Sequence, residues 1–270
     1  MPELPEVETT RRGIAPHIEG HRIEDVVVRN SKLRYGVPRG LAKKLSGQVV
    51  EQVVRRGKYL LLETEVGALM LHLGMSGSLR YVNDGLAATK HDHVDVVFAS
   101  GCLRLHDPRR FGSVLWLPVG SAEHPLLANV GPEPLSDEFN ADYLYQRSRG
   151  RRGPIKNYIM DSKVVAGVGN IYANESLFMA GILPQRAAGR VSLDRYQILV
   201  IKIKQVLQAA IDSGGSTLRD FVNSDGKPGY FAFEHKVYGR EGQPCLACGD
   251  VLKLKRIAQR ATVYCSSCQH

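Results

Sequence analysis

Short runs of apolar and β-branched residues recur through the first half of the chain. They occupy residues 26–28, 49–54, 59–63, 68–73, 94–98, 103–105 and 114–117. Glycines and turn signals such as Asn-Asp-Gly at 83–85 separate the runs, a pattern that is typical of short β-strands. The pattern therefore predicts a sandwich or barrel of antiparallel strands.

Helical patterns flank these strands. Near the start of the chain, Val7, Ile14 and Ile18 share one helical face, although Pro16 interrupts it. Beyond the Pro-rich connector at residues 131–134, apolar residues return at helical spacing. The clearest repeat is formed by Leu199, Ile203, Val206 and Ala210. The chain is therefore expected to be an α+β protein with more than one domain.

Two serines are placed to cap helices in the second half. Ser136 precedes acidic residues at 137–138, and Ser192 precedes the repeat described above, which the glycine pair at 214–215 ends. Residues 216–231 are polar and contain glycine, so they are expected to form a mobile loop that closes over a ligand.

The length of 270 residues suits two domains and a small appendage. The chain shows no secretory signal and no run of about twenty apolar residues, so we expect a cytoplasmic protein that does not bind membranes. Cys102 lies in an apolar run and is expected to be a buried, unreactive side chain.

Positive charge is concentrated in two segments. Residues 147–163 carry a net charge of +5, and residues 236–270 carry a net charge of +4. Together they equal the formal charge of +9 of the whole chain. Two separate basic segments indicate a polyanionic partner, and nucleic acid is the leading candidate.

Four cysteines near the end form two Cys-x-x-Cys pairs, Cys245 with Cys248 and Cys265 with Cys268. Sixteen residues separate the pairs, enough for a hairpin that brings four thiolates around one zinc ion. Two disulfides are the alternative, which the missing secretory signal disfavours. Four protein ligands leave no open position on the metal, so the zinc is expected to be structural.

Three further segments carry candidate chemistry. Gly-Val-Gly-Asn at 167–170 precedes a helical pattern and could form a phosphate site or an ordinary turn. Asp-Pro-Arg-Arg-Phe-Gly at 107–112 could wedge into a DNA duplex, aided by Met75, or pack on the sandwich as an ordinary turn. Pro2 would become a secondary amine if Met1 were removed, beside the carboxylate of Glu3.

Taken together, these segments resemble the bacterial formamidopyrimidine-DNA glycosylases, and the resemblance runs from end to end. The motifs that carry it are Met-Pro-Glu-Leu-Pro-Glu-Val-Glu-Thr at 1–9, Arg-Gly-Lys-Tyr-Leu at 56–60, His-Leu-Gly-Met-Ser-Gly at 72–77, His-Asp-His at 91–93, Asp-Pro-Arg-Arg-Phe-Gly at 107–112, Gly-Val-Gly-Asn-Ile-Tyr-Ala at 167–173, and the cysteine pairs.

The resemblance implies roles for individual residues. Pro2 would be the nucleophile that attacks C1′ of a damaged nucleotide, and Glu3 would assist opening of the sugar ring. Lys58 would act as an acid in the elimination steps, and Arg260 would hold the phosphates at the lesion. Met75, Arg109 and Phe111 would fill the gap left by the everted base. The positions implied to contact the DNA backbone are His91, Arg110, Arg151, Lys156 and Asn170.

The resemblance also implies a domain plan. A β-sandwich with an N-terminal helix would occupy residues 1–130, a helix-two-turns-helix domain residues 131–235, with the lesion-recognition loop near 216–231, and a four-cysteine zinc-finger hairpin residues 236–270. The partner would be damaged double-stranded DNA, bound by a monomer that needs one zinc ion and no organic cofactor.

The implied activity is that of a bifunctional glycosylase and abasic-site lyase that removes oxidised purines and then cuts the strand by β,δ-elimination. Two alternatives remain at this point. One is an endonuclease VIII-like enzyme for oxidised pyrimidines, against which Leu4 and the Pro-Arg-Arg-Phe segment argue. The other is a zinc-ribbon DNA-binding protein without catalysis.

Overall fold

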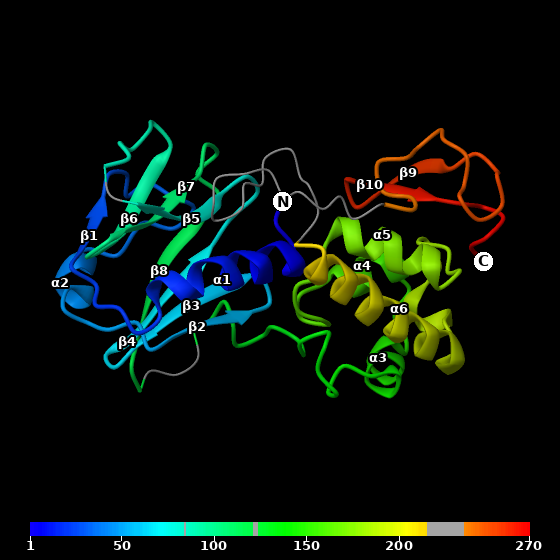
Figure 1. Ribbon diagram of the computed structural model, residues 1–270. Helices are drawn as coiled ribbons and strands as arrows, with labels where there is room; N and C mark the ends of the chain where they lie inside the picture. Colours follow the sequence, from blue (N-terminus) through cyan, green and yellow to red (C-terminus); the bar gives the residue numbers. More distant parts are fainter. Residues whose placement is uncertain (84, 121–123, 215–234) are drawn as a thin grey trace. The chain divides into compact units, whose positions relative to one another are not determined.

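The computed structural model describes residues 1–83, 85–120, 124–214 and 235–270, so the predicted loop at 216–231 lies outside the described residues. The described chain forms two compact units (Figure 1). The first runs from Met1 to Ala128, and the second combines Asn129–Asp212 with residues 235–270.

The first unit is a sandwich of two four-stranded antiparallel sheets (Figure 1). The strand order is β1-β6-β7-β5 in one sheet and β2-β3-β4-β8 in the other. The strands are β1 (Asp25–Val28), β2 (Gln52–Arg56), β3 (Tyr59–Thr64), β4 (Gly67–His72), β5 (Ser78–Asn83), β6 (Asp92–Phe98), β7 (Gly101–His106) and β8 (Ser113–Pro118). Of the two predicted architectures, the sandwich is the one observed.

The core of the sandwich lies between the facing sheets. Leu60 and Leu62 of β3 enter it from one sheet, and Val94 and Val96 of β6 enter it from the other. The opposite side of β3 is also covered, because Leu61 packs in a second apolar cluster. Burial on both faces explains why β3 and β4 read as continuous apolar runs in the sequence.

One strand was not predicted. β5 lies at the edge of its sheet, where it pairs with β7 alone, and it carries Arg80 and Tyr81 among its apolar residues. Ser78, Arg80 and Asn83 are polar positions within this strand, so its sequence lacks the continuous apolar run that revealed the others, including the other edge strands.

Helix α1 (Leu4–Ile18) packs against β2 and β5, which are edge strands of the two sheets. The ring of His17 stacks on Tyr81 of β5 with the ring centroids 4.8 Å apart. The predicted interruption at Pro16 is wrong, because the helix continues to Ile18. Proline in the last turn removes one backbone donor, while burial of Ile14 and Ile18 holds the helix on the sheet.

A buried carboxylate anchors α1 to β2. Glu8 accepts hydrogen bonds from Arg11 and Arg12 of its own helix and from Nε of Arg55 on β2, at 3.1 Å. Burial by itself raises the pKa of the Glu8 carboxyl, but the arginine partners outweigh burial and hold the pKa below its usual value. Arg55 also donates to the carbonyl oxygen of Gly57 at 3.1 Å, in the turn after β2. The helix is thereby tied to the β2–β3 turn.

The second unit is helical and ends in a β-hairpin. α5 packs against α4 and α6, and α3 packs against α6. Its elements are α3 (Ala141–Ser148), α4 (Ile155–Met160), α5 (Asn170–Met179), the 3-10 helix η1 (Ala188–Arg190), α6 (Leu193–Asp212), β9 (Lys253–Ile257) and β10 (Arg260–Tyr264). The first unit also holds the short helix α2 (Leu41–Leu45). Within the described chain, no helix combines the length and apolarity needed to cross a bilayer.

The helix caps follow the prediction at one position and differ at the other. α6 begins directly after Ser192, as expected. The predicted start at Ser136 is wrong, because α3 begins at Ala141 and Asn140 caps it by accepting a hydrogen bond from the N–H of Tyr143 at 2.9 Å. Ser136 instead donates to the carbonyl oxygen of Glu133, an arrangement typical of turns.

The anchor of α1 predicts an asymmetry between two arginines that bind the same carboxylate. Arg55→Met should lower the free energy of unfolding by roughly 2–3 kcal/mol, because it leaves the buried Glu8 without its β2 partner. Arg12→Met, at a side chain that is 52% exposed, should cost less than about 1 kcal/mol. Urea unfolding of both variants measures this, and equal losses would contradict the anchor.

Candidate functional site

The N-terminal candidates lie at the start of α1. Met1 is 39% exposed, whereas Pro2 and Glu3 are buried. Glu3 is the N-cap residue, and its N–H donates to the carboxylate of Glu6 at 2.8 Å. The positive end of the helix dipole faces this end of the chain and favours negative charge there.

Lys58 occupies the tight turn between β2 and β3, which Gly57 enters with a φ of 57°. The side chain is half-buried and close enough to His72 to influence its protonation. Burial, followed by the charges of Lys58 and Arg34, lowers the pKa of His72 to about 4. His72 is therefore neutral at neutral pH, and its Nδ1 accepts a hydrogen bond from the N–H of Gly74 at 3.0 Å.

Two loops that carry predicted wedge residues are in contact. A side chain on Gly74 would place its Cβ 2.5 Å from the backbone N of Gly112, so the loops touch through backbone atoms and require glycine. Buried Asp107 fixes the second loop by accepting a hydrogen bond from the N–H of Gly112 at 2.7 Å. The loops expose two large apolar side chains, Met75 (42%) and Phe111 (41%).

The two arginines of the second loop differ in their contacts. The guanidinium carbon of Arg109 lies 4.9 Å from the ring centroid of Phe111, which is a cation–π contact. Arg110, between Arg109 and Phe111, has a φ of 57°, so the backbone turns at this exposed residue. The side chains of Arg109 and Arg110 are both exposed. The loop that carries Met75 contacts the loop that carries Arg109 and Phe111, so the three predicted wedge residues lie on adjoining loops.

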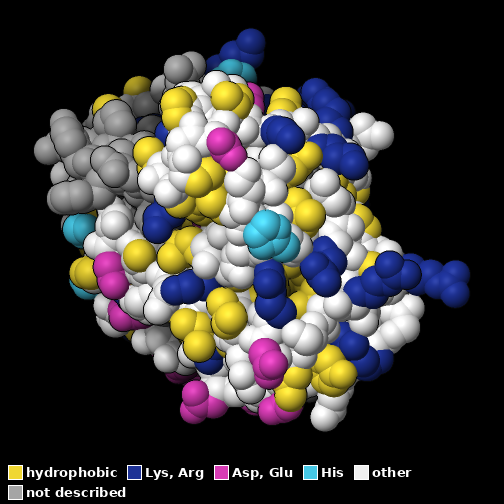
Figure 2. Space-filling view, turned by 90° about the vertical axis from the view of Figure 1, so that its right-hand side faces the viewer, with side chains coloured by type: hydrophobic (Ala, Val, Ile, Leu, Met, Phe, Trp, Pro, Cys, Tyr) yellow, Lys and Arg dark blue, Asp and Glu magenta, His cyan; other side chains and the backbone are white. Residues whose placement is uncertain are grey.

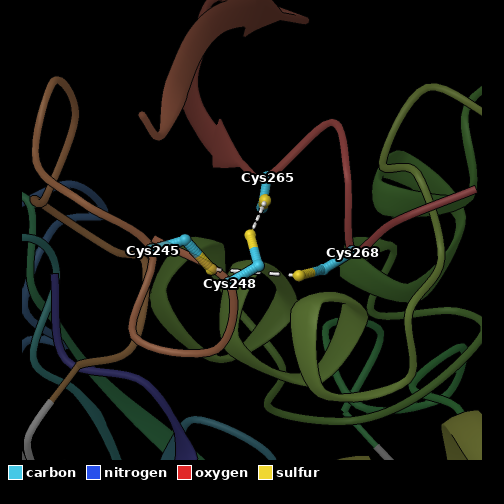
Figure 3. Close-up of side chains that lie close together, drawn as sticks. All are labelled: Cys245, Cys248, Cys265 and Cys268. Atoms are coloured by element: carbon cyan, nitrogen blue, oxygen red, sulfur yellow. Dashed lines mark hydrogen bonds between the residues drawn. The ribbon is translucent and has the colours of Figure 1, made fainter. Parts of the chain in front are cut away.

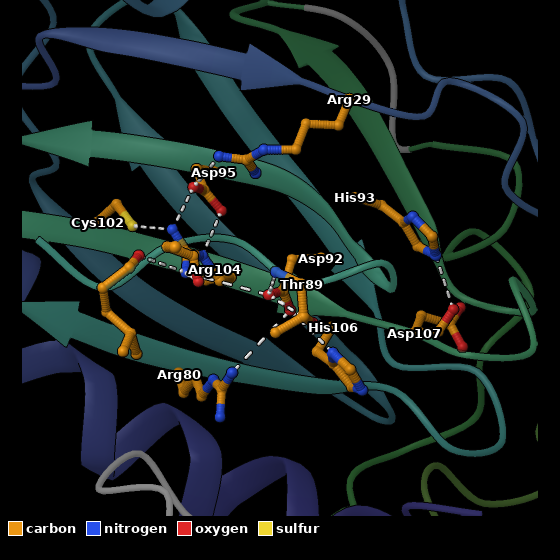
Figure 4. Close-up of polar contacts among 12 residues, drawn as sticks. Arg29, Arg80, Thr89, Asp92, His93, Asp95, Cys102, Arg104, His106 and Asp107 are labelled. Atoms are coloured by element: carbon orange, nitrogen blue, oxygen red, sulfur yellow. Dashed lines mark hydrogen bonds and ion pairs between the residues drawn. The ribbon is translucent and has the colours of Figure 1, made fainter.

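His91 lies beside the same loop. Its carbonyl oxygen accepts a hydrogen bond from the N–H of Asp107 at 2.9 Å, and its ring packs edge-on against the rings of His93 and His106. His93 donates from Nε2 to the carbonyl oxygen of Asp107 at 2.8 Å (Figure 4). Asp107 thus joins the segment of His91 to the loop at residues 107–112, which we call the wedge loop.

In the second unit, Asn170 is the first residue of α5, directly after the Gly-Val-Gly segment. Gly167 has a φ of 77°, which explains the glycine at that position. The side-chain oxygen of Asn170 is buried without a hydrogen-bond partner among the described residues. Helix N-termini in general favour anions, and the expected contact of Asn170 with a phosphate stays a prediction.

Lys156 of α4 is fully buried and binds the hairpin. Its Nζ donates to the carbonyl oxygen of Ala261 at 2.9 Å and to Oγ1 of Thr262 at 2.7 Å. Both acceptors lie on β10, which begins at Arg260. Arg260 itself is exposed. The structure thus shows Lys156 supporting the strand of Arg260, and its expected contact with DNA stays a prediction.

The turn between β9 and β10 is formed by Ala258 and Gln259, with φ values of 46° and 64°. Positive φ at both central residues of a two-residue hairpin is the arrangement that matches the twist of the strands. The hairpin is therefore tight at the point where it presents Arg260.

Arg151 lies at a basic depression of the second unit with a volume of 610 Å³. Its lining residues are Gly150, Arg151, Arg152, Ala187, Gly189 and Arg190. Figure 2 shows Lys and Arg side chains gathered over the right half of one molecular face, with few acidic side chains among them. A surface of this charge favours a polyanion.

The four cysteines converge as the spacing predicted (Figure 3). Their Sγ atoms all lie within 4.8 Å of one another, with 3.5 Å between those of Cys248 and Cys265 and 3.9 Å between those of Cys245 and Cys268. Four sulfurs at about 2.3 Å from a central zinc ion would be about 3.8 Å apart. The cysteines are unpaired, so the disulfide alternative is wrong, and the site suits one structural zinc ion.

Comparison with known proteins covers both units. The Formamidopyrimidine-DNA glycosylase N-terminal domain matches residues 1–114, the Formamidopyrimidine-DNA glycosylase H2TH domain matches residues 130–222, and the zinc finger found in FPG and IleRS matches residues 242–270. A formamidopyrimidine-DNA glycosylase of Acidithiobacillus ferrooxidans is 58% identical over 270 residues, all of both chains, and one of Methylococcus capsulatus is 57% identical over the same span.

This chain belongs to the formamidopyrimidine-DNA glycosylase family. Solved structures agree: that of the Thermus thermophilus protein is 40% identical with a TM-score of 0.89, covering 99% of this chain and 98% of that chain. A Lactococcus lactis variant in complex with DNA containing Fapy-dG is 32% identical with a TM-score of 0.91, covering 99% of each chain. The expected fold of sandwich, helix-two-turns-helix domain and zinc-finger hairpin is confirmed.

Sequence reasoning missed the carboxylate that connects the helices of this glycosylase to its zinc finger. Glu175 of α5 is fully buried and accepts hydrogen bonds from three successive backbone N–H groups, those of Lys236, Val237 and Tyr238, at 2.8–3.0 Å. The available signal was a charged residue in the helical segment 171–178, which has apolar residues at both ends.

The pKa of His72 predicts how acid affects this glycosylase. Because a folded-state pKa of about 4 lies below the usual value of about 6.5, the unfolded chain binds the proton more tightly between these pH values. The free energy of unfolding should therefore fall as the pH drops through this range, by about 2 kcal/mol at pH 5 relative to pH 8 from this residue.

His72→Gln should remove that part of the pH dependence, while His21→Gln, at an exposed histidine, should keep it. Urea unfolding of the three proteins at both pH values measures the difference. An undiminished pH dependence in His72→Gln would contradict the burial argument.

Zinc binding makes a second prediction for this site. The purified protein should hold one zinc ion per chain, and Cys265→Ser should lose it, whereas Cys102→Ser should keep it because Cys102 lies in the sandwich. Hydrogen exchange should show that chelation exposes the backbone of β9 and β10 and spares the sandwich. Zinc retained in Cys265→Ser would contradict the four-thiolate assignment.

Proposed function

We propose that this protein is a bifunctional DNA glycosylase and abasic-site lyase of base excision repair, which removes oxidised purines through a covalent intermediate on Pro2. One observation carries the proposal. An exposed Met1 precedes a buried Pro2 at the start of an anchored helix, in a chain that matches the glycosylase family over its full length.

Removal of Met1 would leave the nitrogen of Pro2 as a secondary amine. Its lone pair attacks C1′ of the damaged nucleotide, and the bond from C1′ to the base breaks as the base leaves with the electron pair. The sugar ring then opens as its oxygen takes a proton, and an iminium forms between Pro2 and C1′. We assign Glu3 to assist the ring opening, because it directly follows Pro2 at the helix N-terminus.

The elimination steps need proton transfer and a hold on the phosphates. We assign Lys58 as the acid, since its turn is tied to α1 through Arg55 and Glu8. Arg260 is assigned to the phosphates at the lesion, because it is an exposed cation at the head of a strand that Lys156 supports. β-Elimination breaks the C3′–O bond and δ-elimination the C5′–O bond, which cuts the strand on both sides of the sugar.

The remaining candidates bind and open the duplex. We assign Met75, Arg109 and Phe111 to fill the gap left by the everted base, because their contacting loops expose two apolar side chains beside a guanidinium. Extrusion of a base costs a few kcal/mol, which damage reduces. The residues assigned to the DNA backbone are His91, Arg110, Arg151 and Asn170. Lys156 is fully buried, so we assign it to act on DNA binding through β10, the strand that carries Arg260.

We further propose that the protein acts as a monomer on damaged double-stranded DNA in the cytoplasm, with residues 1–130, 131–235 and 236–270 as its three domains. Bacterial relatives and solved complexes of a single protein with DNA support this proposal. Lesion recognition is assigned to residues 216–231, which lie outside the described residues.

Borohydride trapping on a duplex that contains 8-oxoguanine tests the proposal. Protein with a verified Pro2 terminus should form a covalent adduct with the DNA, and mass spectrometry should locate the reduced sugar on Pro2. A matched preparation with one additional residue before Pro2 should form no adduct, because its nitrogen is an amide.

Two results would overturn the mechanism. One is the absence of an adduct from protein with a verified Pro2 terminus, and the other is attachment of the sugar to Lys58. A duplex with an oxidised pyrimidine serves as the comparison for substrate class, and more efficient trapping on it would favour the endonuclease VIII-like activity.

A further inference from the structure

A buried carboxylate and a half-exposed histidine form a pair at the end of β7. Nδ1 of His106 lies 2.8 Å from Oδ1 of Asp92, whose side chain is fully buried, whereas the His106 side chain is 29% exposed (Figure 4). Asp92 also accepts hydrogen bonds from the backbone N–H and the hydroxyl of Thr89, at 2.6 and 2.9 Å. Its carboxylate is thus held at a fixed position beside Nδ1 of the histidine ring.

The tautomer of His106 follows from this contact. Burial raises the pKa of Asp92, but the hydrogen bonds from Thr89 and His106 outweigh burial and keep the pKa below its usual value, so Asp92 is ionised. An ionised carboxylate accepts hydrogen bonds and donates none, so Nδ1 of His106 carries a proton. Nε2 lies on the other side of the ring and has no hydrogen-bond partner among the described residues.

The ring of His106 lies next to His91. Their centroids are 5.9 Å apart with the ring planes at 87°, and His91 packs on its other neighbour, His93, at 6.4 Å. Both neighbouring rings are fixed by hydrogen bonds, His106 to Asp92 and His93 to the carbonyl oxygen of Asp107. A ligand that reaches His91 therefore also comes within reach of His106.

The charges around this pair are mainly positive. Arg80 of β5 and Arg104 of β7 each lie 4.0 Å from the Asp92 carboxylate. Asp95 of β6 is already paired with Arg104 and with Arg29 of the segment after β1. The neighbouring arginines attract an anion to the same place.

We propose that His106 is a second phosphate-binding side chain, which contacts the DNA backbone beside His91 and takes up a proton at Nε2 when it does so. This inference rests on the proposed function. The bound phosphate adds a negative charge on the side of the ring opposite Asp92, and an imidazolium between two anions donates one hydrogen bond to each. Asp92 is the positioning residue that orients the ring.

The test measures the affinity of the full protein for a duplex that contains an uncleavable abasic-site analogue, at pH 6 and pH 8 and over a range of salt concentrations. His106→Gln should weaken binding roughly fivefold at pH 6 and less than about twofold at pH 8, because histidine gains its charge towards acid pH. At pH 6 it should also reduce the slope of log affinity against log salt by about one.

His106→Arg keeps a cation at this position and should restore the steep salt dependence at both pH values. His21→Gln is the matched control, at an exposed histidine that bonds to the carbonyl oxygen of Glu19, and it should behave as the wild type does. Calorimetry in two buffers of different ionisation enthalpy should show that proton uptake on binding is smaller in His106→Gln.

A purely structural role for His106 would weaken binding equally at both pH values and leave the salt slope and the proton uptake unchanged, which would overturn the inference. Wild-type affinity of His106→Gln at pH 6 would overturn it as well. Borohydride trapping by the wild-type protein reports separately on the proposed function. If the wild-type protein forms the adduct but His106→Gln binds the duplex as tightly as the wild type, only the phosphate contact of His106 is rejected.

Discussion

A buried carboxylate must receive hydrogen bonds from the protein, because an unpaired charge inside a fold costs several kcal/mol. This requirement shapes the segments that carry the proposed chemistry. Glu8 binds α1 to β2, Asp107 binds the wedge loop, and Glu175 binds the segment that leads to the zinc finger. In each case the acid lies on a regular element or next to one, and its partners lie on the segment that must be positioned.

In the sandwich unit, a buried carboxylate and a close backbone contact together fix the exposed loops. Asp107 connects the backbone of His91 with the loop of Phe111, and the close approach at Gly74 adds the loop of Met75. The exposed side chains of these loops thus rest on backbone positions that leave little freedom. Rigid support of this kind lowers the entropy lost when a ligand is bound.

In the helical unit, polar side chains inside the fold support the hairpin. Lys156 reaches β10 from α4, and Asn174 of α5 accepts a hydrogen bond from the N–H of Val263 on the same strand. The zinc ligands close the far end of the hairpin, at Cys265 and Cys268. Arg260 therefore stands on a strand that is held from two helices and from a metal site.

The sequence by itself determined the features whose signal is local. The zinc ligands, the strands that read as apolar runs, and Pro2 beside Glu3 could be predicted because cysteine spacing, apolar runs and chain position are all read within a few residues. The tertiary structure decided what depends on partners distant in the chain: the edge strand β5, the burial of Lys156 against Thr262, and the pairing of His106 with Asp92. A polar residue looks the same in the sequence whether it faces water or a buried partner, and packing alone determines which of the two it meets.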